Sequence, residues 1–138
     1  MVLRKIHISI LLALMILMTA CEELYIVDCS QCQTTEPTTC MLEIQLGEGS
    51  FNTNYDVTIY RGRIEDGVII ENLQTSTSIN FPVALNSEYT VTSTFSVDGK
   101  EYTAIDATRP KVDLITDMCE ETCYWVYNNS VNLSIKYY

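Results

Sequence analysis

Cysteine offers the widest choice of chemistry in this sequence. The 138 residues include six cysteines, one near the start, three in a front group and two in a back group. In chain order they are Cys21, then Cys29, Cys32 and Cys40, then Cys119 and Cys123. Thiols at such spacings form disulfides, hold a metal ion as thiolates or exchange electrons as a redox pair. The compartment in which the chain works decides among these uses.

Residues 1–20 have the features of a signal peptide. Two basic residues, Arg4 and Lys5, precede an apolar run over residues 6–18 and small residues at 19 and 20. The run has about 13 residues, fewer than the roughly 20 of a stable transmembrane helix. The segment therefore predicts export followed by cleavage, and a permanent membrane span is disfavoured.

The residues around Cys21 resemble the lipobox of bacterial lipoproteins. In that motif a small residue precedes a cysteine that is diacylated on sulfur, cleaved and acylated on its new amine. Ala20-Cys21 fits it, and Met18 stands where the family usually has Leu, Val or Ile. The resemblance implies a diacylglycerol and an N-acyl chain such as palmitate on Cys21, enough for stable anchoring. We expect no other cofactor; an ordinary secretory peptide is the alternative.

The arrangement as a whole resembles small cell-envelope lipoproteins of Bacteroidota, a group that implies no particular chemistry. Glu22 and Glu23, directly after Cys21, resemble the surface-export signals of those lipoproteins. The resemblance implies an outer-membrane location, with the protein facing the periplasm or the cell surface.

Export favours disulfides among the remaining cysteines: Cys29, Cys32, Cys40, Cys119 and Cys123. Bonds between the front and back groups would close loops of about 80 to 95 residues, each worth on the order of 4 kcal/mol. Five thiols leave one over, and the pairing stays open. We expect Cys40, which lies apart from Cys29 and Cys32, to be the odd one.

Two other uses of these cysteines remain as alternatives. A four-thiolate zinc site would join halves roughly 86 residues apart, instead of the roughly 15 to 20 of a zinc ribbon, and oxidation competes with it after export. A thioredoxin-like role for Cys29 and Cys32 requires a helix N-terminus, whereas residues 22–39 predict an irregular tether. We therefore expect no metal.

Composition excludes several classes of function. The one histidine, His7, lies in the segment expected to be removed. Without imidazole, Ser-His-Asp and Cys-His sites and His-ligated zinc are excluded. A net charge of −10 disfavours binding to nucleic acid or to anionic lipid faces. We expect no enzyme and no catalytic residues.

From Met41 onward, apolar and polar residues alternate as in half-buried strands. The most distinctive unit is a hairpin of residues 88–97 and 100–107 around Asp98-Gly99, a pair that tolerates a type I′ turn. A last hairpin is expected from residues 123–127 and 131–137. Seven or eight short strands, with turn signals roughly every 8 to 12 residues, predict an all-β antiparallel sandwich with Greek-key connections.

The middle of the chain resembles transthyretin-like or carboxypeptidase-regulatory-like sandwiches. The shared features are a strand over residues 59–62, a Thr-containing strand over 75–81 and a Tyr-x-Val strand that begins at Tyr89. The resemblance implies a single Ig-like or transthyretin-like sandwich, and it supports the fold without indicating an activity. The expected organisation is a lipoprotein signal peptide at 1–20, a lipidated cysteine and tether at 21–40, and one β-sandwich at 41–138.

Trp125 and Tyr127 lie two residues apart and so share one face of a strand. They could form a platform on which a sugar ring stacks, or they could fill the core. We therefore expect a non-catalytic, lipid-anchored β-sandwich at the outer membrane, a binding or structural accessory whose partners are membrane lipid through Cys21 and an envelope complex. A carbohydrate-binding or adhesive module that uses Trp125 and nearby tyrosines is one alternative, and a small thiol or zinc protein is another.

Overall fold

The computed structural model describes residues 26–47, 54–97 and 99–134. The predicted signal peptide, Cys21, Asp98 and the end of the predicted last strand lie outside these residues. The described part contains a short 3₁₀ helix and nine strands. They are η2 (Cys29–Gln31), β1 (Thr39–Leu46), β2 (Tyr55–Arg61), β3 (Val68–Thr75), β4 (Ile79–Ala84), β5 (Tyr89–Val97), β6 (Lys100–Thr108), β7 (Lys111–Ile115), β8 (Cys123–Tyr127) and β9 (Ser130–Leu133).

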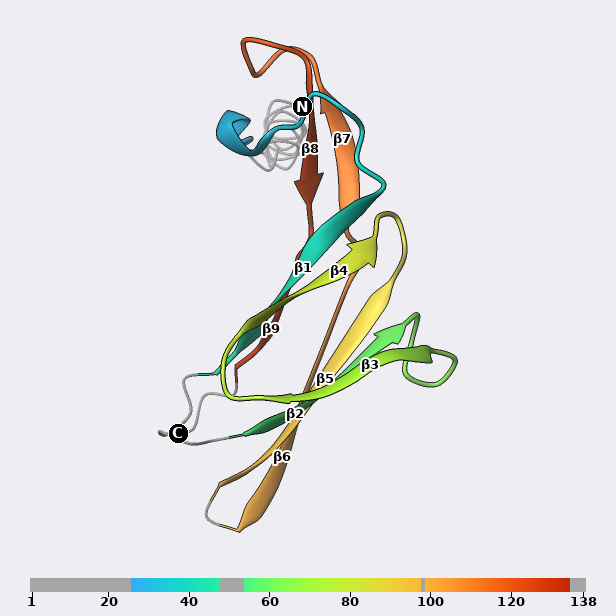
Figure 1. Ribbon diagram of the computed structural model, residues 1–138, viewed down its shortest axis with the longest axis vertical. Helices are drawn as coiled ribbons and strands as arrows, with labels where there is room; N and C mark the ends of the chain where they lie inside the picture. The colour runs from blue at the N-terminus through green and yellow to red at the C-terminus, as the bar shows by residue number, and fades with distance from the viewer. Residues whose placement is uncertain (1–25, 48–53, 98, 135–138) are drawn as a thin grey trace, which may run out of the picture.

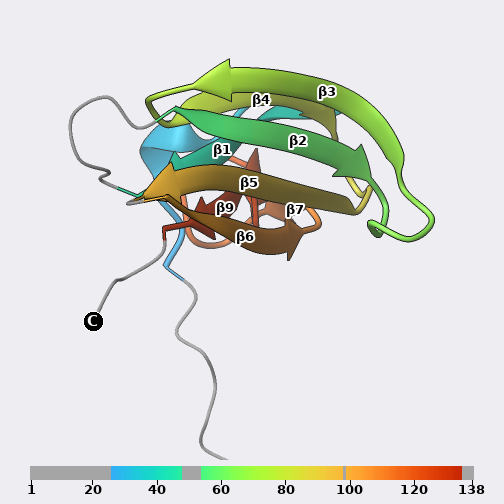
Figure 2. The same cartoon turned by 90° about the horizontal axis from the view of Figure 1, so that it is seen from below.

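Two sheets pack face to face as a sandwich. One has the strand order β4-β1-β9 and the other has the order β3-β2-β5-β6, and Figure 2 shows the second sheet lying across the first. Strands β7 and β8 form a two-stranded sheet of their own at one end of the molecule (Figure 1). The prediction of an all-β sandwich is confirmed, with nine strands in the described residues instead of seven or eight.

The core lies between the two sheets and is built by the alternating residues. Leu42 and Ile44 of β1 face Val57 and Ile59 of β2, and all four side chains are fully buried. The rest of the cluster comes from the same two layers: Leu46, Tyr55, Val83, Tyr89, Val91, Phe95, Val131 and Leu133. Truncating one of the fully buried leucines to alanine would cost about 2–5 kcal/mol, because the cavity could collapse only in part.

A buried polar contact ties the layers together. The backbone N–H of Ala84, in β4, donates to the hydroxyl oxygen of Tyr89, in β5, at 3.0 Å. Tyr89 is fully buried, so this bond satisfies a phenol that would otherwise be desolvated without a partner.

The predicted hairpin around Asp98-Gly99 is confirmed. Strands β5 and β6 pair in register from Tyr89 opposite Thr108 to Val97 opposite Lys100. Gly99 adopts φ +75°, the left-handed conformation that the two-residue turn requires.

The predicted last hairpin is wrong. Strand β8 pairs with β7, whereas β9 runs parallel to β1, with Ile44 opposite Val131. Asn128 has φ +54° and turns the chain away from β8. The backbone N–H of Glu43 then donates to the carbonyl of Asn129 at 2.8 Å, and the Asn129 side chain donates to the carbonyl of Met41 at 3.1 Å. These bonds fix β9 beside β1, and the sandwich therefore contains one parallel pairing among its antiparallel ones.

Candidate functional site

The β7–β8 hairpin and the N-terminal segment before β1 form one unit, which holds most of the residues singled out from the sequence. Gln33 makes an isolated antiparallel bridge to Tyr124 in β8. Its N–H donates to the Tyr124 carbonyl at 2.9 Å and its carbonyl accepts from the Tyr124 N–H at 2.7 Å. The segment therefore continues the hairpin as a third, one-residue strand.

Two disulfides join the same two pieces of chain. Cys29 bonds to Cys119 and Cys32 bonds to Cys123, across sequence separations of 90 and 91 residues. The prediction of disulfides is confirmed, and the pairing, which the sequence left open, joins the front group to the back group. The Cα–Cα distances of 5.7 and 5.5 Å lie in the usual range for disulfides.

Cys40 is the remaining cysteine of the described residues and has no disulfide, as expected. It is half-buried near the start of β1, and this burial raises the pKa of its thiol. A raised pKa keeps the thiol protonated near neutral pH, and the thiolate is the reactive form. Cys40 therefore acts as a small core-edge side chain with low reactivity.

Asp28 fixes the short helix that carries Cys29. Its carboxylate accepts from the backbone N–H of Ser30 at 3.0 Å and from the Ser30 hydroxyl at 2.7 Å. These hydrogen bonds hold the pKa of Asp28 below its ordinary value. Asp28 thereby caps the N-terminal end of η2, directly before Cys29.

Trp125 and Tyr127 share one face of β8 and lie beside each other, as expected. Their ring centroids are 5.6 Å apart and the planes differ by 13°. Both side chains are half-buried and neither belongs to the core cluster. Asp113 and Lys111 of β7 lie opposite them in the register. Burial, together with the charge and hydrogen bond of Asp113, raises the pKa of Tyr127.

A cavity of about 400 Å³ opens onto the two disulfides. Its lining includes all four bonded cysteines together with Glu120 and Glu121. The cysteines approach closely: the Sγ atoms of Cys32, Cys119 and Cys123 all lie within 4.8 Å of one another. The fold thus brings the sulfur atoms of the front and back cysteines together beside a cavity that is open to solvent.

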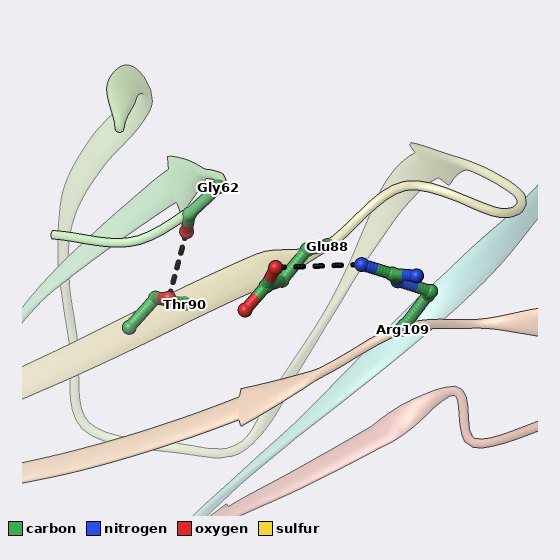
Figure 3. Close-up of polar contacts among 4 residues, drawn as sticks. All are labelled: Gly62, Glu88, Thr90 and Arg109. Atoms are coloured by element: carbon green, nitrogen blue, oxygen red, sulfur yellow. Dashed lines mark hydrogen bonds and ion pairs between the residues drawn. The ribbon is translucent and has the colours of Figure 1, made fainter. Parts of the chain in front are cut away.

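A second cavity of about 400 Å³ was not expected from the sequence. Arg63, Glu88 and Arg109 contribute to its lining, and Figure 3 shows Glu88 and Arg109 pointing toward each other, 3.5 Å apart. Arg109 is exposed and Glu88 is partly exposed, so solvent screens the ion pair and it is worth at most about 1 kcal/mol. The glycine turn after β2 borders the same region: the Thr90 hydroxyl donates to the Gly62 carbonyl at 2.7 Å (Figure 3).

Two carboxylates of the described residues accept hydrogen bonds that link neighbouring strands. Asp106 accepts a hydrogen bond from the backbone N–H of Asn132 at 2.8 Å, which links β6 to β9. Asp56 accepts from Gln74 at 2.6 Å across the β2–β3 pair. These carboxylates hold strands together.

Comparisons with protein-family models, with curated proteins and with solved structures give no match for this chain. Across residues 26–47, 54–97 and 99–134, the structure has no helix with the length and apolar character to span a bilayer.

Proposed function

We propose that this protein is a non-catalytic, lipid-anchored β-sandwich of the bacterial outer membrane, of the kind found among small Bacteroidota cell-envelope lipoproteins. It acts there as a binding or structural accessory of a larger envelope complex. Acyl chains on Cys21 supply the anchor and the sandwich supplies the surface that a partner contacts. The lack of a histidine beyond residue 20 argues against the common hydrolytic mechanisms.

The observation that carries the proposal is the double disulfide. A free segment of residues 22–39 would extend at most about 60 Å from the anchor. The bond from Cys29 to Cys119 limits the connection to about eight residues, or at most about 28 Å. The β7–β8 end of the sandwich is thereby kept near the membrane, and Figure 1 shows the β5–β6 hairpin reaching the opposite end.

This geometry suits an accessory that is presented in one orientation. Without residues 1–20, which contain Arg4 and Lys5, the anchored chain has 6 basic and 18 acidic residues and a formal charge of −12. Anionic headgroups repel such a chain, so the sandwich stands away from the lipid within its short reach. The partner then meets the faces and edges of the sandwich that point away from the anchor. Restricting reach and orientation raises the effective concentration of those surfaces for a membrane-bound partner.

Fractionation and cross-linking in cells test the proposal. We expect wild-type protein and the matched control Cys40→Ala in the membrane fraction, and we expect Cys21→Ala in the soluble fraction. A short cross-linker applied before detergent extraction should recover one recurrent envelope protein with the wild type and lose it with Cys21→Ala. Membrane association of Cys21→Ala equal to that of wild type would contradict the proposal.

A carbohydrate-binding or adhesive function is the second candidate. It is favoured by the stacked Trp125 and Tyr127 pair, which lies outside the core cluster and keeps part of its surface exposed. Aromatic rings bind the apolar faces of sugars by stacking. Trp125→Ala should abolish binding to a purified cell-surface polysaccharide, whereas Tyr124→Ala, on the other face of β8, should preserve it. Equal binding by both variants and wild type would contradict this function.

A further inference from the structure

The sulfur atoms of the two disulfides form one compact cluster. Three of them, from Cys32, Cys119 and Cys123, lie within 4.8 Å of one another, and the sulfur of Cys29 is bonded to that of Cys119. In a tetrahedral zinc site with Zn–S bonds of about 2.3 Å, neighbouring sulfurs are about 3.8 Å apart. Shifts of roughly an ångström would turn the cluster into such a site.

We propose that Cys29, Cys32, Cys119 and Cys123, once both disulfides are reduced, bind one Zn²⁺ ion or a similar divalent cation as four thiolates. Each S–S bond takes two electrons and two protons from a dithiol reductant, which becomes a cyclic disulfide, and two thiols result. The cation then displaces the four thiol protons to solvent as four metal–sulfur bonds form.

Backbone hydrogen bonds, in addition to the S–S bonds, hold one ligand from each half of the cluster near the other. Cys32 and Cys123 directly precede Gln33 and Tyr124, whose two backbone hydrogen bonds join the N-terminal segment to β8. Cys123 is also fixed by its place in the β7–β8 register, opposite Ile115. Reduction therefore leaves at least one ligand from each half of the cluster next to the other, and this partial preorganisation lowers the entropy cost of binding.

A cation can reach the cluster. The cavity of about 400 Å³ opens onto all four cysteines, and Cys29 is exposed to solvent. Glu120 and Glu121 also line that cavity, and their negative charge raises the local concentration of cations. The long sequence separation between the front and back cysteines does not prevent a shared zinc site, because the fold brings the two groups together.

The same four cysteines would thus provide two alternative cross-links, a pair of disulfides or one bound metal ion. Under oxidation the disulfides tie the N-terminal segment to the β7–β8 hairpin, and under reduction the metal ion does so with the same four residues. The inference does not rest on the proposed function, because it requires only the sulfur cluster and a dithiol.

Cobalt titration of the full chain tests this inference. The protein, purified in detergent, is reduced with dithiothreitol, freed of reductant without oxygen and titrated with Co²⁺, whose thiolate charge-transfer absorption reports sulfur ligation. We expect one Co²⁺ per chain, displacement by one Zn²⁺, and no such absorption for the oxidised protein. Cys32→Ser removes a direct ligand and should weaken binding at least as much as the loss of an outer-shell partner, which costs about 10- to 100-fold. The matched control Cys40→Ser should leave binding unchanged.

A second measurement on the wild-type chain avoids variants that fail to fold. Reduced protein is alkylated with and without Zn²⁺, and the modified cysteines are mapped by mass spectrometry. We expect Zn²⁺ to slow alkylation of all four ligands at least tenfold and to leave Cys40 unaffected. Absence of thiolate absorption in reduced wild type, a stoichiometry other than one, or protection that includes Cys40 and omits Cys29 would overturn the inference.

Discussion

The two disulfides should stabilise the fold in a non-additive way. Cys29–Cys119 and Cys32–Cys123 close loops of nearly equal length, with separations of 90 and 91 residues. In the chain-entropy model, the first bond to form is worth about 4.6 kcal/mol, because it closes one of these long loops. The second bond then closes a ring of only about nine residues and is worth about 2.6 kcal/mol.

Serine variants separate the two contributions. Removing either pair, as Cys29→Ser with Cys119→Ser or as Cys32→Ser with Cys123→Ser, should cost about 2.6 kcal/mol, because the other bond keeps the long loop closed. Removing both should cost about 7 kcal/mol, which exceeds the two single losses together by about 2 kcal/mol.

Equilibrium unfolding in urea, followed by Trp125 fluorescence in the presence of a chelator, measures these values. The m-value should increase in the variant without disulfides, because its unfolded state exposes more surface. A loss of about 4.6 kcal/mol for each pair, or a combined loss no larger than the two single losses together, would refute the reasoning that one bond shortens the loop of the other.

Substitutions at a buried serine, at two turn glycines and at Tyr127 should also change the stability of the fold in defined directions. Ser93 is fully buried and its hydroxyl has no hydrogen-bond partner within the described residues. Ser93→Ala should therefore raise the free energy of unfolding by up to about 1 kcal/mol and shift the urea midpoint upward. A lowered midpoint would contradict this. A Cβ on Gly67 would overlap a backbone carbonyl of the β2–β3 turn, whereas one on Gly99 meets no atom within 4 Å but needs φ +75°. Gly67→Ala should therefore lower the free energy of unfolding by about 3 kcal/mol and Gly99→Ala by about 1 kcal/mol. The reverse order would be incompatible with this turn. The pKa of Tyr127 is raised, so the folded state favours the neutral phenol. The contribution of Tyr127 to the free energy of unfolding is therefore complete below the ordinary pKa of 10.0 and is lost as the pH rises through the folded pKa. Tyr127→Phe should thus lose less stability than wild type between about pH 9 and pH 12, and Asp113→Asn should reduce the shift; identical pH profiles would contradict it.

Local pattern in the sequence predicted most strands. Leu42 and Ile44 in β1, and Val57 and Ile59 in β2, alternate with polar residues and are all buried. Because side chains on a strand alternate in direction, a period of two marks both the strand and its inner face. The β5–β6 hairpin followed from the Asp-Gly turn for the same reason, since a two-residue loop leaves the adjacent strands little choice of partner.

Pairing between distant strands could not be predicted. Nothing local to residues 123–133 distinguishes a hairpin of β8 with β9 from the observed arrangement, in which Asn129 bonds to Met41 and Glu43 and lays β9 along β1. The partner of a strand is decided by contacts far away in sequence, and alternation carries no information about direction. The parallel pairing of β1 with β9 was missed for this reason.

The sequence predicted which residues belong to the candidate site, but it did not predict how they are arranged in space. The expectation of export indicated disulfides among five cysteines, and the side-by-side position of Trp125 and Tyr127 followed from strand periodicity. The disulfide pairing depends on which strand Gln33 bridges, a contact with Tyr124 that has no signal in the sequence. The Arg63 and Arg109 cavity was missed because each arginine follows a different strand and only the fold brings them together.

We propose that the mature chain begins at an acylated Cys21 and works while attached to the envelope. Intact mass spectrometry of the native protein, extracted from membranes with detergent, tests it most directly. We predict a mass equal to residues 21–138 with two disulfides, increased by a diacylglycerol and one N-acyl chain. A chain that retains residues 1–20, or one that begins at an unmodified Cys21, would contradict the account.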